Sequence, residues 1–164
     1  MKIAVRQAVG VAPARAIAAY ATPAFYVGRP GRDDIAVVEV VRHEDLGDRV
    51  VIEVRCAFTG SVSGAVRRVI DPGKMSWVTR TEVRPADLRT TWVVLPDHYP
   101  DRLSASGTYR FAAGEDGPDS TVVHVEGELK VHVPIVGRSV EKVIVTDLRQ
   151  YIVDEVAGIP DLAQ

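Results

Sequence analysis

The sequence predicts an α+β fold, in which a curved antiparallel sheet of about seven strands grips a long C-terminal helix. Val supplies 29 of the 164 residues, and its branched Cβ suits the pleated surface of a sheet. A long alternating strand, Ser120 to Val133, leads through Pro134 into a helix-period segment, Val136 to Ala157. This junction predicts a sheet packed against the closing helix, and the length suits a single domain, residues 1–164.

The first elements are a strand and two short helices. Lys2 to Val11 reads as a strand, and Pro13 opens an Ala-rich helix from Ala14 to Tyr20, since the first helical turn tolerates a missing N–H. Thr22 is a suitable N-cap ahead of Pro23, which predicts a second short helix through Tyr26.

Six further strands follow, separated by polar turns. They are Ile35 to His43, Val50 to Phe58, Lys74 to Arg84, Leu88 to Leu95, Leu103 to Ala112 and Ser120 to Val133. Short connections that contain Gly, Pro and Asp, such as those at Gly47 and Pro85, predict antiparallel neighbours. Gly60 to Asp71 instead has apolar residues at helical spacing and predicts a short amphipathic helix, either a lid over a pocket or a structural plug.

The final strand and the closing helix define the interior. Gly127 in the middle of the strand predicts a bulge or the close approach of another element. The apolar arc of the helix contains Val136, Val140, Val143, Ile144, Leu148, Tyr151, Ile152 and Val156. Two carboxylates, Glu141 and Glu155, fall within this arc, and we expect them either at its solvated edges or in use inside, because an unpartnered buried carboxylate is costly.

Composition and charge exclude several function classes. A formal net charge of −2 provides no field for nucleic acid or an anionic membrane surface, and no apolar run reaches the roughly 20 residues that span a bilayer. A lone Cys56 excludes an internal disulfide, and the first residues lack a signal-peptide pattern, so a cytoplasmic protein is expected. No Gly-rich loop has phosphate-binding spacing, so no cofactor is predicted.

Residues capable of chemistry are dispersed along the chain. His124 and His132 share one strand face roughly 26 Å apart, so they do not bind one ion and no metal site is predicted. Cys56 has the parity of core strand residues. His98, in the connection between two strands, is either a plain turn residue or a group that accepts a proton from a phenol or an enolisable ketone.

Three polar residues follow a four-residue spacing along one flank of the closing helix: Asp147, Tyr151 and Glu155. If this flank faces a cavity, Tyr151 and Glu155 are candidate catalytic residues, since an apolar pocket raises the pKa of a carboxylic acid toward neutrality. If it does not, Tyr151 is a core residue and the two acids are solvated.

Three motifs resemble a known family: Val11 to Ala16, Tyr20 to Tyr26, and Gly127 to Lys142. Together with the order of elements over the whole chain, they resemble the helix-grip fold of the START and Bet v-like superfamily, also called SRPBCC, and within it a bacterial family of unknown function.

The resemblance implies a cavity between sheet and helix for a lipid-, polyketide- or sterol-like molecule. Candidate ligand-binding residues are Val140, Ile144, Leu148, Tyr151, Tyr109, Phe111, Val125 and Leu129. The favoured function is binding or carriage of such a molecule without catalysis, and the alternative is a polyketide-type cyclase or dehydratase that uses Tyr151, Glu155 and His98. A third expectation is a structural role in a complex, in which the strand edge Ile35 to His43 pairs with another chain, and a homodimer is one possible pairing.

Overall fold

The computed structural model describes residues 1–27, 35–61, 64–68, 71–135 and 137–162. These residues form seven strands, which are β1 (Lys2–Val9), β2 (Ile35–Asp45), β3 (Val50–Phe58), β4 (Ser76–Arg84), β5 (Arg89–Pro96), β6 (Leu103–Ala113) and β7 (Thr121–Val131). The α-helices among them are α1 (Pro13–Tyr20), α2 (Ala24–Val27), α3 (Gly64–Arg67), α4 (Gly137–Ala157) and α5 (Ile159–Leu162), with 3₁₀ turns at Pro72–Lys74 and Pro85–Asp87.

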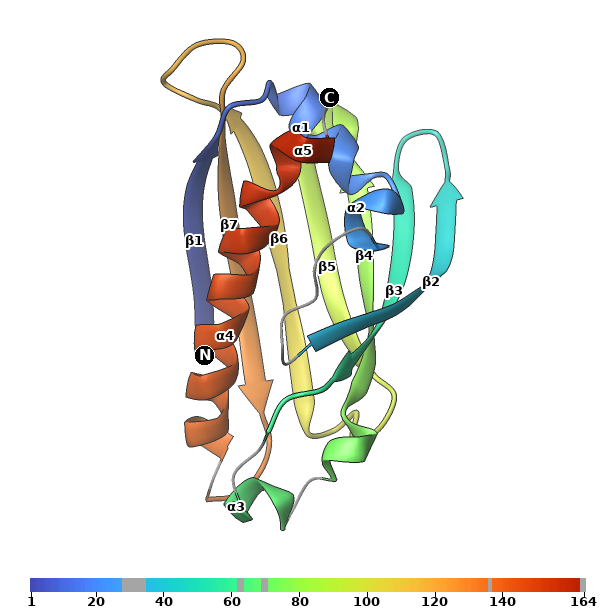
Figure 1. The fold of residues 1–164 in the computed structure, drawn as a ribbon, viewed down its shortest axis with the longest axis vertical. Helices are drawn as coiled ribbons and strands as arrows, with labels where there is room; N and C mark the ends of the chain where they lie inside the picture. Colours follow the sequence, from blue (N-terminus) through green and yellow to red (C-terminus); the bar gives the residue numbers. More distant parts are fainter. Residues whose placement is uncertain (28–34, 62–63, 69–70, 136, 163–164) are drawn as a thin grey trace.

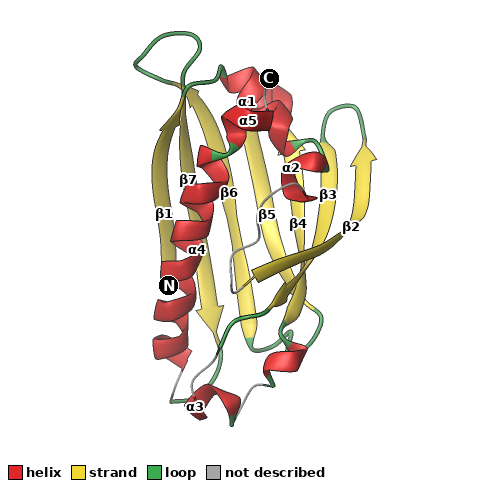
Figure 2. Ribbon diagram, viewed as in Figure 1, coloured by secondary structure: helices red, strands yellow, loops and turns green. Residues whose placement is uncertain are grey.

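All seven strands belong to one antiparallel sheet with the order β1-β7-β6-β5-β4-β3-β2. The sheet curls into a half-barrel, so that β2 crosses in front of the neighbouring strands in Figure 1. Helix α4 runs along β1 and β7 inside this curl, and α1 and α5 meet at one end of it on the same side of the sheet (Figure 2). The predicted fold class is therefore confirmed, including the short helices after the first strand.

The inner face of the sheet is organised in lateral rows, because residues in register on neighbouring antiparallel strands lie side by side. The row that we call the Trp92 row contains Ile52, Thr81, Trp92, Gly107, Gly127 and Ile3. The next row toward α1, the Tyr109 row, contains Val50, Val83, Thr90, Tyr109, Val125 and Val5. Most members of both rows are buried, so these rows form the floor of the interior.

Gly127 marks a close approach rather than a bulge. It pairs with Gly107 on β6, and Gly107 pairs with Trp92 on β5. Indole carbons Cζ2 and Cε2 of Trp92 lie 2.6 and 2.7 Å from the position that a Cβ on Gly107 would take, and Cζ2 lies 3.0 Å from that position on Gly127. The two glycines thus make the hollow in which the indole ring lies.

The rotation of α4 differs from the predicted arc at two positions. Val143 is 62% exposed, whereas Val145, which the arc omitted, is buried beside Ile152 and Val156. The reason is the position of the helix over β1 and β7, which turns the face centred on Val145 toward these strands. Val136 lies outside the described residues.

The predicted helix over Gly60 to Asp71 is shorter than expected. Only Gly64–Arg67 is α-helical within the described residues, and a 3₁₀ turn at Pro72–Lys74 follows, where the side chain of Asp71 accepts a hydrogen bond from the Gly73 N–H. Residues 62–63 and 69–70 lie outside the described part, so the lid and the plug interpretations of this segment both remain predictions.

Candidate functional site

A tyrosine and a glutamate form a polar pair inside the apolar interior. The hydroxyl of Tyr109, in the middle of β6, donates a hydrogen bond to Oε2 of Glu155, in the last turns of α4, over 3.2 Å. Tyr109 is 6% and Glu155 is 7% exposed. Because carboxylates are rarely buried without a defined purpose, this pair is the centre of the candidate site.

The environment keeps the Tyr109 hydroxyl protonated. Its pKa is raised well above the usual value, first by burial and then by the negative charge of Glu155 and by the nearby Tyr151. A protonated phenol is a hydrogen-bond donor, which is the role that the geometry gives it toward Glu155.

Helix α4 places Tyr151 beside the pair, as the four-residue spacing predicts. Tyr151 lies one turn before Glu155, is half-buried, and is close enough to Tyr109 to affect its pKa. Asp147, a further turn away, is also half-buried. The second carboxylate of the predicted arc, Glu141, lies near the other end of the helix, where its Oε1 accepts a hydrogen bond from the Val131 N–H.

An aromatic cluster closes the end of the interior next to the pair. It consists of Tyr20 from α1, Phe25 from α2, and Tyr109 and Phe111 from β6. Ring centroids of Tyr20 lie 5.2 Å from Tyr109 and 5.3 Å from Phe111. The sequence reasoning missed Tyr20 and Phe25, although both belong to the motif Tyr20 to Tyr26 that carries the family resemblance.

Strand β5 adds two buried polar atoms to the same floor. Thr90 is 1% and Trp92 is 8% exposed, and neither Thr90 Oγ1 nor Trp92 Nε1 has a hydrogen-bond partner among the described residues. A buried donor or acceptor without a partner costs about 1–3 kcal/mol. Sequence reasoning assigned no binding role to either residue, because alternation shows which side of a strand is inward but not which polar atoms lack partners there.

The eight predicted ligand-binding residues lie on α4 and on the inner face of the sheet. Those from the sheet, Tyr109, Phe111, Val125 and Leu129, are buried on its inner face. Those from α4, Val140, Ile144, Leu148 and Tyr151, are half-buried, and the three aliphatic ones pack against the core. The structure therefore distributes the eight along the length of α4 and of the inner face of the sheet, and their role in binding remains a prediction.

His98 lies at the opposite end of the sheet from Glu155. Its loop joins β5 to β6, and the neighbouring residue Arg102 accepts a hydrogen bond at its carbonyl from His132, just after β7. Tyr109, which contacts Glu155, is six residues along β6 from Leu103, roughly 20 Å at about 3.3 Å per residue. The exposed His98 is thus too far away to act together with Tyr151 and Glu155.

The loop of His98 is fixed by polar contacts of its neighbour. Arg55 Nη1 on β3 donates a hydrogen bond of 2.6 Å to Asp97, and the Asp97 N–H donates one of 3.0 Å to the Ser76 carbonyl. The hydrogen bond from Arg55 holds the pKa of Asp97 below its usual value. These contacts match the turn interpretation of this connection.

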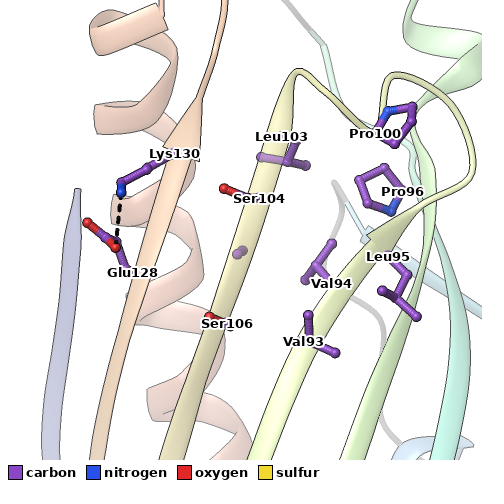
Figure 3. Close-up of a pocket in the computed structure, with 11 residues that line it drawn as sticks. Val93, Val94, Leu95, Pro96, Pro100, Leu103, Ser104, Ser106, Glu128 and Lys130 are labelled. Carbon is purple, nitrogen blue, oxygen red and sulfur yellow. Dashed lines mark ion pairs between the residues drawn. The ribbon is translucent and has the colours of Figure 1, made fainter.

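A pocket of about 390 Å³ lies on the outer face of the sheet, where β5 and β6 separate beyond the pair Val94–Ala105. Figure 3 shows it from the side opposite α4, with the ion pair of Glu128 and Lys130 (3.4 Å) at one edge. The outward residues Val93, Leu95, Ser104 and Ser106 contribute to its lining. It is separate from the Tyr109–Glu155 pair, which lies on the inner face.

Other candidate chemistry is absent from the part of the chain that the structure describes. No group of three or more His, Cys, Asp or Glu residues there is arranged to hold a metal ion. Cys56 is buried on the inner face of β3, and burial raises the pKa of its thiol to about 11, so it is not an activated nucleophile. Within the same residues, no helix is long and apolar enough to cross a membrane.

Comparison with solved structures identifies the fold. A START superfamily protein from Mycobacterium smegmatis matches with a TM-score of 0.58 and 16% identity over 96% of this chain and 94% of that one. Norcoclaurine synthase from Thalictrum flavum matches with a TM-score of 0.61 and 17% identity over 95% and 83%. Zhui aromatase/cyclase from Streptomyces sp. R1128 matches with a TM-score of 0.53 and 11% identity over 81% and 69%.

Sequence comparison identifies the family. No protein with a curated description matches this chain. Residues 4–159 match the family described as "Protein of unknown function (DUF2505)", which is nearly the whole length. The chain therefore belongs to the DUF2505 family and has the helix-grip fold of the START and Bet v-like superfamily.

Proposed function

We propose that this protein binds and carries a hydrophobic small molecule in the space between α4 and the inner face of the sheet, without covalent chemistry. The observation that carries the proposal is the buried hydrogen bond between Tyr109 and Glu155 inside a largely apolar interior. Small-molecule sites are mostly apolar, with a few polar groups that fix the orientation of the ligand. The fold shared with a START superfamily protein supports the proposal, because that resemblance implies a cavity at this place.

The proposed lining comes from both sides of the space. Val140, Ile144, Leu148 and Tyr151 of α4 are half-buried, so they contact the core and keep part of their surface accessible. Tyr109, Phe111, Val125 and Leu129 form the opposite wall.

The experiment combines native mass spectrometry of the gently purified protein with titration of the neutral apolar dye Nile red. We expect the wild type to bind the dye and Ile144→Trp to bind it at least tenfold more weakly, because the indole fills the proposed space. Val143→Trp is the matched control, since Val143 is the next residue along the helix and is 62% exposed. Failure of the wild type to bind, or equal binding by both variants, would refute the proposal.

A second candidate function is acid–base catalysis of the polyketide cyclase or dehydratase type in the same space. The cluster of Glu155, Tyr109 and Tyr151 favours it, and an aromatase/cyclase shares the fold. In this scheme, the Glu155 carboxylate takes the proton from a carbon next to a ketone, while the Tyr151 hydroxyl gives its proton to the ketone oxygen. An enol forms, and Glu155 then returns its proton to the Tyr151 phenolate.

Turnover by variants tests this second candidate. Glu155→Gln and Tyr151→Phe should each abolish most of the turnover of an identified substrate, whereas His98→Ala should retain it, because His98 lies at the other end of the sheet. Unchanged turnover in Glu155→Gln and Tyr151→Phe would contradict the assignment of these two residues as base and acid.

We also propose that the protein works in the cytoplasm of a bacterial cell, where a reducing environment suits the free thiol of Cys56. A homodimer through β2 is proposed as well, since β2 is an edge of the sheet and offers backbone groups for pairing. Sedimentation at high protein concentration tests the dimer, and a monomer under those conditions contradicts it.

A further inference from the structure

The fold leaves two buried polar atoms on β5 without a hydrogen bond to any described residue. Trp92 Nε1 and Thr90 Oγ1 belong to side chains that are more than nine-tenths buried, and neither atom has a hydrogen-bond partner among the described residues. Buried polar groups in folded proteins nearly always have partners. These two atoms therefore point to a ligand.

Both atoms lie on the floor of the proposed binding space. Thr90 and Tyr109 are register partners on neighbouring strands, which places their Cβ atoms about 5 Å apart. Trp92 is two residues further along β5 on the same face, with its indole over the hollow of Gly107 and Gly127. The Tyr109–Glu155 pair and the two unpartnered atoms thus lie close together at the inner face of the sheet.

The chemistry of the atoms limits the ligand. An indole N–H is a donor and cannot accept, so its partner must be a hydrogen-bond acceptor. Carboxylates and phosphates are acceptors, but the carboxylate of Glu155, which lies on α4 and accepts the hydrogen bond of Tyr109 from the floor, repels an anion, and this repulsion is weakly screened in the buried interior. A neutral acceptor remains, and an apolar molecule carries it most simply as a carbonyl.

We infer that the ligand is a neutral apolar molecule with a ketone-type carbonyl, which accepts a hydrogen bond from Trp92 Nε1. The inference rests on the proposed binding function and narrows its ligand class: it excludes fatty-acid anions and plain hydrocarbons as preferred occupants. Thr90, whose hydroxyl both donates and accepts, binds a second polar group of the same molecule.

Three naphthalenes of nearly equal size test the inference by calorimetric titration. They are 2-acetylnaphthalene, 2-isopropenylnaphthalene, which replaces the carbonyl oxygen by CH₂, and 2-naphthoate, which is an anion. We expect the ketone to bind about threefold to tenfold more tightly than the alkene, as one net hydrogen bond gives. We expect the wild type to bind naphthoate more weakly than the ketone. We expect Glu155→Gln to bind naphthoate more tightly than the wild type does.

Substitutions in β5 test whether Trp92 causes the preference for the ketone over the alkene. Trp92→Phe should remove the preference for the ketone, so that ketone and alkene bind this variant with the same affinity. Thr91→Val, a matched change at the outward position between Thr90 and Trp92, should leave the preference intact.

A spectroscopic measurement covers the case in which Trp92→Phe does not fold. The chain has two Trp residues, so Trp77→Phe leaves Trp92 as the source of the indole N–H resonance in ¹⁵N-labelled protein. The ketone should shift this resonance downfield more than the alkene does. Equal affinity for ketone and alkene with no differential shift overturns the inference but leaves the binding function standing, whereas no binding of any of the three probes also contradicts the proposed function.

Discussion

The indole ring of Trp92 lies against Gly107, its register partner on β6. A Cβ at Gly107 would stand 2.6 Å from Cζ2 of the indole and 2.5 Å from the Glu126 carbonyl oxygen. Side chains do not approach backbone so closely, and the carbonyl cannot rotate away because β6 and β7 pair along their whole length. The position of the indole, and with it the floor of the candidate site, therefore depends on a glycine here.

Gly107→Ala should destabilise the protein. The added methyl group must displace either the indole or the backbone of β7, and overpacking of this kind costs about 1–3 kcal/mol. The midpoint of urea-induced unfolding measures the loss. Gly10→Ala is the matched control, since its added Cβ meets no heavy atom within 4 Å beyond its own chain neighbours, and it should change stability by less than about 0.5 kcal/mol. Equal stability of the two variants would show that the hollow tolerates a side chain.

Most of the fold could be predicted from the sequence, because period-2 and period-3.6 patterns report directly on burial. Val50–Phe58 is confirmed at both ends, and the strand predicted from Ser120 to Val133 is Thr121–Val131. The rotation of α4 could not be predicted as well. Its apolar residues spread widely around the helix, so the pattern left open whether Val143 or Val145 faces the sheet, and the contact with β1 and β7 decides in favour of Val145.

The candidate site was predicted in part. Glu155 stood out as a carboxylate within an apolar arc, and this local feature marked the residue that the structure buries against Tyr109. That Trp92 Nε1 lacks a hydrogen-bond partner could not be predicted, because the atoms that surround it are set by the pairing of four strands, β4 to β7. His98 was grouped with Glu155 because a loop residue at one end of the cavity could reach a ligand, but the direction of β6 places its loop at the end of the sheet opposite Glu155.

The hydrogen bond between Tyr109 and Glu155 should be measurable as a coupling energy. Tyr109→Phe removes the donor, and loss of a buried hydrogen bond to a carboxylate costs about 1.5–3 kcal/mol. In a double-mutant cycle with Glu155→Gln, urea unfolding should give a coupling of at least about 0.5 kcal/mol. Tyr99→Phe is the control for loss of a phenol, since Tyr99 lies in the β5–β6 loop and its hydroxyl accepts a long bond of 3.4 Å from the Asp71 N–H. Additive effects of the two core variants would contradict the coupling.

Cys56 should make the protein less stable at alkaline pH. Burial raises the pKa of its thiol from 9.0 to about 11, so the folded state holds this proton more tightly than the unfolded state does. The stabilisation from this group is complete below pH 9 and is lost as the pH rises through about 11, a change of about 1–3 kcal/mol. The free energies of unfolding of wild type and Cys56→Ala, measured from pH 8 to 11, should differ by this amount in their pH dependence.

Thiol labelling gives an independent check on Cys56. At pH 8, a disulfide reagent such as DTNB should react slowly with the native protein and rapidly in denaturant, because the buried thiol stays protonated and inaccessible. Rapid labelling of the native protein, with a midpoint near pH 8.5, would contradict the raised pKa.

Glu141 should hold the end of β7 in a pH-dependent manner. Its Oε1 accepts a hydrogen bond of 2.8 Å from the Val131 N–H, and this bond, more than any other interaction, keeps the pKa of Glu141 below its usual value. A lowered pKa means that the contribution of Glu141 is present above pH 4.5 and is lost as the pH falls through its folded pKa. We expect Glu141→Ala to accelerate hydrogen exchange of the Val131 amide at neutral pH, and the wild type to show the same acceleration, relative to the intrinsic rate, once the pH falls below the folded pKa of Glu141. The control is Glu126→Ala on the exposed face of β7, where the carboxylate forms an ion pair with Arg110 at 3.6 Å, and this variant should leave the exchange rate of the Val131 amide unchanged. If the Val131 amide stays protected in Glu141→Ala, its protection comes from contacts other than the hydrogen bond to Glu141.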